Sequence, residues 1–163
     1  MKLVLVAVLL MSNVVHAEVA ETPYLVGVSA GARFMPGTSY PELAVSASRR
    51  WWGRLHVGAR TTAGVSATSK VVKGLAEVGV VLHPSRSLEV LLAWRVGRAY
   101  HRVLFPSGAM IPIHATVLEP VVELGFRIGG ATQIRVAPFT VAAHHAQMWL
   151  AVMGAEITVA RRF

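Results

Sequence analysis

GAEITVARRF, residues 154–163, alternates between two kinds of side chain with a period of two. Ile157 and Val159 fall on one side of this repeat, whereas Glu156 and Thr158 fall on the other. A helix repeats every 3.6 residues and cannot separate the two sets onto opposite faces, but a strand can. The stretch therefore predicts a β-strand with one apolar face.

The same alternation recurs along the chain between turn signals such as Pro36-Gly37 and Gly129-Gly130. The predicted strands are residues 23–34, 41–49, 54–64, 74–83, 88–98, 118–128, 133–141 and 148–163. Residues 99–117 form the longest predicted connection and are unusually apolar for a loop. The pattern predicts an all-β fold, an eight-stranded antiparallel up-and-down barrel. Pro120 and Pro138 fit poorly, because proline removes a donor from the ladder.

Composition narrows the class of protein. The 163 residues suit one domain, and 54% of them are hydrophobic while only 15% are charged. There is no cysteine, which excludes disulfides and thiolate metal sites. Sixteen Lys and Arg against eight acids give a formal charge of +8, but the basic residues are dispersed rather than clustered. This dispersion argues against a nucleic-acid partner.

The N-terminus predicts export. Lys2 precedes an apolar run over residues 3–11, and small or β-branched residues follow at 15–17. This is typical of a secretory signal peptide, residues 1–17, cleaved after Ala17. The mature part, residues 18–163, is then a single β-barrel domain.

The non-apolar side of the strands favours a barrel that spans a membrane. It combines many glycines with charges of both signs, whereas the whole chain has three Lys, one Asn, two Gln and no Asp. Small residues beside Arg and Glu suit a narrow lumen, and tilted spanning strands need about 9–11 residues. The side chains predicted to pair as ions inside the lumen are Arg33, Arg60, Glu77, Glu89, Arg95, Glu123, Arg127, Arg135 and Glu156.

Signal peptide, strand number, alternation and terminal strand together resemble the small eight-stranded outer-membrane β-barrels of Gram-negative bacteria. That class includes the membrane domain of outer membrane protein A and the opacity proteins. The resemblance implies an outer-membrane location and a C-terminal insertion signal at Ile157, Val159 and Phe163, from which Arg161 departs. The barrel-insertion machinery would read this signal.

The resemblance also implies that both chain ends are periplasmic and that the longer loops face outward. A basic rim would then meet outer-membrane lipid and the phosphates of lipopolysaccharide. Its predicted members are Lys70, Lys73, Arg98, His101 and Arg102.

Three functions remain open. The first is a structural or surface-interaction role for a barrel plugged by Arg/Glu pairs, without enzyme activity, cofactor or metal and with an unidentified surface partner. The second is a lipid A-modifying enzyme, because some small barrels deacylate lipid A with a Ser–His–acid set. His114 and Thr116 have that spacing, although Thr replaces Ser, and Glu123 is a candidate acid. The third is a soluble periplasmic, lipocalin-like calyx.

Two further readings are weaker. A porin-like pore would be narrow, because side chains fill an eight-stranded barrel. His144 and His145 are adjacent, so on a strand they point to opposite faces and do not share a metal.

Overall fold

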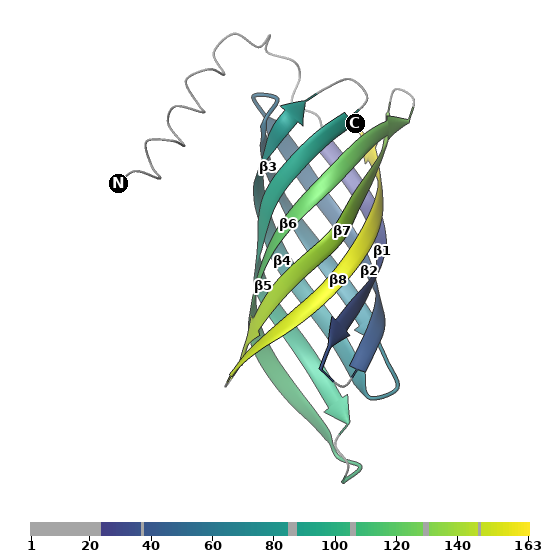
Figure 1. The fold of residues 1–163 in the computed structure, drawn as a ribbon, viewed down its shortest axis with the longest axis vertical. Coiled ribbons are helices and arrows are strands. Elements are labelled where there is room, and N and C mark those ends of the chain that lie inside the picture. The colour runs from purple at the N-terminus through teal and green to yellow at the C-terminus, as the bar shows by residue number, and fades with distance from the viewer. Residues whose placement is uncertain (1–23, 37, 85–87, 105–106, 129–130, 147) are drawn as a thin grey trace, which may run out of the picture.

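The computed structural model describes residues 24–163 except 37, 85–87, 105–106, 129–130 and 147. In this part of the chain, eight antiparallel strands form a closed barrel (Figure 1). The strands are β1 (Tyr24–Met35), β2 (Thr38–Trp51), β3 (Leu55–Val65), β4 (Ser69–Pro84), β5 (Leu88–Leu104), β6 (Met110–Ile128), β7 (Thr132–His145) and β8 (Trp149–Arg162). The predicted signal peptide, residues 1–17, lies outside the described residues.

Closure depends on β1 and β8. They pair antiparallel from Leu25↔Arg162 to Phe34↔Met153. The ladder ends where Phe163 N donates to Tyr24 O at 3.0 Å. The predicted eight-stranded up-and-down barrel is therefore confirmed. Among the described residues, no helix is long and apolar enough to cross a membrane.

The barrel has two distinct ends. We call the rim near Tyr24 and Phe163 the terminal end; it lies at the top of Figure 1. The opposite rim, where β1, β3, β5 and β7 turn back, is the loop end. There the β5–β6 hairpin projects beyond the other strands (Figure 1).

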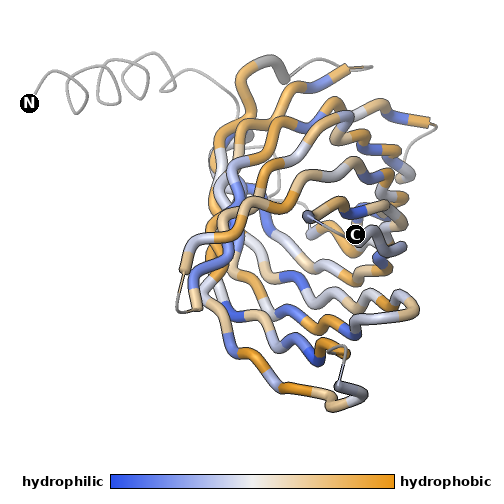
Figure 2. The backbone as a smooth tube through the Cα atoms, turned by 60° about the horizontal axis from the view of Figure 1, so that its bottom comes forward, coloured by the Kyte–Doolittle hydropathy of each residue, from blue (hydrophilic) through white to orange (hydrophobic). Residues whose placement is uncertain are grey.

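Alternation separates an apolar exterior from a polar interior. On the outside, Val28 and Leu43 are 60% and 63% exposed, whereas their inward neighbours Ser29 and Glu42 are 1% and 3% exposed. The colours in Figure 2 switch between hydrophobic and hydrophilic along the strands. Two smaller apolar clusters also lie inside, one around Val117 and Val152 and one around Val81.

The predicted loop over residues 99–117 was wrong. β5 continues to Leu104 and β6 begins at Met110, and their pairs run without a break from Leu88↔Phe126 to Leu104↔Met110. Ala99 and Ala115 point inward while Tyr100 and His114 point outward. The apolar character of the segment therefore belongs to an extended hairpin, whose cross-strand pairing carries the alternation past the other strands.

The two prolines are accommodated differently. Pro138 lies where β7 gains one residue on β8, since the register shifts between Ala137 and Thr140. Pro138 and Phe139 both face outward, as expected for a β-bulge. Pro120 also faces outward and pairs with Trp94 of β5. A bulge in β7 thus explains the misfit of Pro138.

Candidate functional site

Acidic side chains in the described part of the chain all point into the barrel. They are six glutamates, and none of them is more than 9% exposed. Six basic side chains are buried among them. We call these twelve residues the interior network: Glu42, Glu77, Glu89, Glu119, Glu123, Glu156, Arg33, Arg50, Arg60, Lys73, Arg95 and Arg135. Buried charges are tolerated when they are paired, so their contacts decide whether the lumen is stable.

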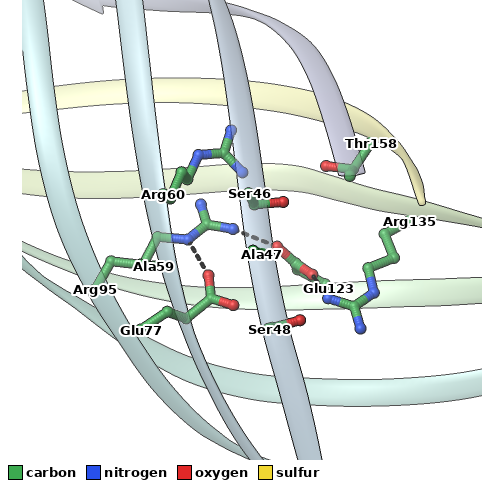
Figure 3. A pocket seen from close by; sticks show the side chains of 10 residues that line it. All are labelled: Ser46, Ala47, Ser48, Ala59, Arg60, Glu77, Arg95, Glu123, Arg135 and Thr158. Carbon is green, nitrogen blue, oxygen red and sulfur yellow. Dashed lines mark hydrogen bonds and ion pairs between the residues drawn. The ribbon is translucent and has the colours of Figure 1, made fainter. Parts of the chain in front are cut away.

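Arg95 of β5 is the centre of the interior network. Its Nε donates to Glu77 of β4 at 2.5 Å, and its Nη1 donates to Glu119 of β6 at 3.2 Å. Nη2 donates to Glu156 of β8 at 3.0 Å and also to Glu123 of β6. Figure 3 shows Arg95 directed at Glu77 and Glu123 across a small pocket. One guanidinium group on β5 therefore links side chains of β4, β6 and β8.

Arg33 of β1 makes a second centre. Its Nε donates to Glu42 at 3.1 Å, and its Nη2 lies 3.1 Å from both Glu119 and Glu156. Nη1 donates to the Thr140 hydroxyl. Arg33 and Arg95 thus share two carboxylates, which makes the two centres one connected set.

Nearer the terminal end, several basic side chains pair with Glu89. Arg50 binds it with both terminal nitrogens, at 2.7 and 3.0 Å, and Gln133 Nε2 donates to it at 2.5 Å. Arg127 and Arg135 approach the same carboxylate at 3.7 and 3.9 Å. Arg135 also donates to Glu123 at 3.4 Å, which joins this group to the centre.

Glycines on the inward face provide the space for this packing. A Cβ on Gly154 would lie 2.6 Å from Arg33 Cδ, and one on Gly125 would lie 2.5 Å from Gln133 Nε2 and 2.8 Å from Glu89 Cγ. These glycines are required by close approach of network side chains rather than by backbone conformation.

The structure places all nine side chains predicted for the lumen inside the barrel, each within 4 Å of an opposite charge. Sequence reasoning missed Arg50, because the predicted second strand ended one residue too early. It also missed His56, whose Nε2 lies 2.5 Å from Glu77. Glu42 and Glu119 were left out as well, although both lie on predicted strands. All four residues have inward parity, which was the available signal.

Two predicted rim residues were wrong. Lys73 is 1% exposed, and its Nζ lies 2.5 Å from Glu42 inside the barrel. His101 is buried as well, and its Nε2 lies 3.0 Å from His144 Nδ1. The predicted strand began after Lys73, and the predicted loop contained His101. Neither residue was therefore assigned to the inward face of a strand. Tyr40 is also buried, opposite Arg33 on the neighbouring strand.

The other three rim residues form a basic outer face. Lys70, Arg98 and Arg102 are exposed on β4 and β5 at the loop end. Lys70 and Arg102 are direct cross-strand partners. Arg98 Nη1 donates to the Thr116 hydroxyl at 3.1 Å. Like charges directly opposite in a sheet are destabilising, and no glutamate among the described residues lies on this face to offset them.

The catalytic candidates are not brought together. His114 is exposed on the outside of β6, where its ring lies 5.1 Å from that of Tyr100. Thr116 faces the same way and accepts the bond from Arg98. Glu123 has opposite parity and binds Arg95 and Arg135 inside the barrel. The expected set of His114, Thr116 and Glu123 is therefore contradicted by the two faces of β6.

His144 and His145 point to opposite faces, as expected: His144 is buried and His145 is exposed against Trp149. Within the described ranges, no group of three or more potential metal-ligating side chains is found. The predicted insertion residues Ile157, Val159 and Phe163 are all exposed on the outside of the last strand or just after it.

No family model and no curated protein matches this chain. Solved structures do match. Neisserial surface protein A has a TM-score of 0.65 at 11% identity, covering 88% of this chain and 96% of that one. The N-terminal β-barrel domain of Pseudomonas aeruginosa OprF has a TM-score of 0.64 at 10% identity, covering 88% and 100%. Ail of Yersinia pestis, in complex with the heparin analogue sucrose octasulfate, has a TM-score of 0.59 at 10% identity, covering 87% and 97%.

The outer-membrane enzyme PagL is similar as well, with a TM-score of 0.52 at 13% identity, covering 83% of this chain and 97% of that one. The chain therefore has the fold of the small eight-stranded outer-membrane barrels, as the sequence resemblance implied. At these identities the likeness concerns the fold and transfers no residue roles.

Proposed function

We propose that this protein is an integral outer-membrane barrel with a structural and surface-interaction role. Its interior network closes the lumen, and its basic outer face binds phosphate groups of lipopolysaccharide. The apolar exterior contacts lipid, and Ile157, Val159 and Phe163 present the signal to the insertion machinery.

One observation carries the proposal: the distribution of polarity is inverted. Every described glutamate is buried inside, while large apolar side chains such as Val28, Leu43 and Ile157 are more than half exposed outside. In water this exterior would be a large aggregation-prone surface, but in a bilayer it is the preferred one. Closure of the barrel also satisfies the strand edges, which a bilayer requires.

The interior does not suit a lipocalin-like calyx. An apolar ligand needs an apolar cavity, whereas the pocket in Figure 3 is lined by Arg60, Glu77, Arg95, Glu123 and Arg135, with small neighbours. The same packing argues against a wide pore.

Fractionation with a mobility assay tests the location. We expect the protein in washed outer membranes, migrating as a compact band on a denaturing gel until it is boiled. Recovery in the soluble periplasmic fraction, with the same gel mobility before and after boiling, would contradict the proposal. It would favour the soluble calyx instead.

The basic outer face supports lipopolysaccharide phosphates as the partner. Lys70 and Arg102 repel each other across the ladder, so an anion bridging them would remove an unfavourable interaction. Arginine forks and ammonium groups are the usual phosphate ligands. Ail, which is similar in fold, was crystallised in complex with the heparin analogue sucrose octasulfate, and this supports an anionic saccharide as the partner proposed here.

Binding to lipopolysaccharide and to its dephosphorylated form tests this partner. We expect the double variant Lys70→Gln/Arg102→Gln to weaken binding of the phosphorylated form by about tenfold or more. Arg161→Gln, an exposed arginine at the other end, is the matched control. Equal binding of both lipid forms, or equal loss in the control, would refute the assignment.

No described carboxylate reaches His114, so a Ser–His–acid mechanism on the outer face has no orienting acid. The enzyme alternative is therefore the weaker candidate.

A further inference from the structure

The mouth of the lumen at the terminal end holds more cations than the interior network can neutralise. Three guanidinium groups lie around one carboxylate, and a fourth lies at the same rim. Arg50, Arg127 and Arg135 all lie within 3.9 Å of Glu89. Arg162 lies within electrostatic range of Glu89 and of the three other arginines. The group has a formal excess of three positive charges, which Arg135 reduces only by sharing Glu123.

Glu89 cannot satisfy these cations. Its two oxygens already accept both terminal nitrogens of Arg50 and the amide of Gln133. Arg127 and Arg135 remain at 3.7 and 3.9 Å from it, which is beyond hydrogen-bond length. Both guanidinium groups are therefore attracted to Glu89 without a bond to it.

Several donors in this group have no acceptor among the residues that the structure describes. The Nε atoms of Arg50, Arg127, Arg135 and Arg162 are buried without a hydrogen-bond partner, and so is Nη2 of Arg135. Arg135 is only 7% exposed. An unpaired buried donor is destabilising, and more so when it is charged, so five in one place need an explanation.

The group can be reached from the terminal end. The Arg127 side chain is 26% exposed, and Arg162 is half-buried on the last strand beside it. Access at the rim and unpaired donors below it are the features that an anion site needs, with the more exposed Arg127 and Arg162 at the entrance and the buried Arg135 deeper.

We propose that this mouth binds a phosphate group, held by Arg127, Arg162 and Arg135. Phosphate offers several acceptor oxygens and matches the planar fork of arginine. Its charge offsets an excess that the described residues leave uncompensated. The group comes either from free phosphate or from the headgroup of an anionic phospholipid at the same rim. This site lies at the opposite end from the basic outer face and does not depend on it.

The direct test is calorimetric titration of the purified, folded barrel in an uncharged detergent at low ionic strength. The probe is inorganic phosphate, with chloride at equal ionic strength as the blank. We expect saturable binding of phosphate beyond the chloride response. Absence of saturable phosphate binding to the unmodified protein would overturn the proposal, whatever the variants do.

Adjacent arginines supply a matched pair of variants. Arg162→Gln removes a charge that faces the mouth, whereas Arg161→Gln removes the same charge from the exposed outer side of the same strand. Loss of one charge-assisted contact predicts about tenfold weaker phosphate binding for Arg162→Gln and for Arg127→Gln. Arg161→Gln should stay within about twofold. Equal weakening in both neighbours would mean general charge attraction and would refute a built site.

A second binding experiment, with a lipid as the probe, identifies the source of the phosphate group. Short-chain phosphatidylglycerol below its micelle concentration is compared with the corresponding diacylglycerol, which lacks phosphate. Tighter binding of the phospholipid than of inorganic phosphate, competed by phosphate, assigns the site to a lipid headgroup. Phosphate binding with no gain from the lipid assigns it to a free anion. Compact gel mobility of each variant before boiling verifies that it is folded.

Discussion

Replacing Arg95 by methionine tests whether the interior network holds the barrel together. Arg95 is 1% exposed and contacts four carboxylates. Methionine keeps much of the volume and removes the charge. Among the described residues, Glu77 then keeps only His56 as a charged partner, and Glu123 keeps only Arg135 at 3.4 Å.

The expected loss follows from leaving buried carboxylates uncompensated. Removing one partner of a buried pair destabilises by about 3–5 kcal/mol. Urea unfolding in detergent micelles measures it. With a denaturant slope of about 2 kcal/mol per molar, the midpoint should fall by about 1.5–2.5 M.

The control is Arg98→Met, three residues along the same strand and on the exposed outer side. It makes the same chemical change but breaks only the bond to Thr116. We expect a change within about 1 kcal/mol. In Arg95→Met, adding Glu123→Gln should restore part of the stability by neutralising a stranded charge. If Arg95→Met and Arg98→Met unfold at the same urea concentration, the reasoning is refuted.

Further predictions concern packing, assembly and activity. Gly154→Val should abolish the compact gel band, because even a Cβ there lies 2.6 Å from both Ala32 O and Arg33 Cδ; an unchanged band would show that β1 and β8 can adjust around the added side chain. Phe163→Ser should lower the amount of barrel assembled in outer membranes, whereas Tyr24→Ser at the same rim should not; parallel losses would contradict an insertion signal. Planar bilayers containing the protein should show no conductance steps, and steps would mean an open lumen. Mass spectra of lipid A should be the same with and without the protein, and a shift in acyl content would revive the enzyme.

The sequence predicted the barrel well because its information is local. A strand that spans a lipid layer shows its two faces as alternation, and eight such segments need no knowledge of distant contacts. The inward charges were found for the same reason. Glu77 and Arg95 lie in the middle of strongly alternating stretches, so their parity was readable, and the cross-strand pair Glu77↔Arg95 follows from it.

Prediction failed where strand length depends on a partner. Nothing local distinguishes a long loop from a projecting hairpin over residues 99–117. It is the pairing of Tyr100 with His114 and of Leu104 with Met110 that makes it a strand. Lys73 was assigned to the rim through the same kind of error at the start of β4. The bulge at Pro138 is equally hidden, since it changes the register between two strands rather than the pattern of one.

The structure shows where the excess positive charge of the chain lies. Six acids and six bases are buried together, so the lumen is close to neutral and the described glutamates are used up inside. In the described part of the chain, the surplus lies on the rims as the basic residues not among those twelve: Lys70, Arg98 and Arg102 at the loop end, and Arg49, Arg54, Arg127, Arg161 and Arg162 at the terminal end. A basic balance that would suggest nucleic acid in a soluble protein instead marks two positively charged rims. Both rims suit anionic headgroups, so we expect substitutions of exposed rim residues to alter binding more than stability, and substitutions at the centre of the interior network to alter stability.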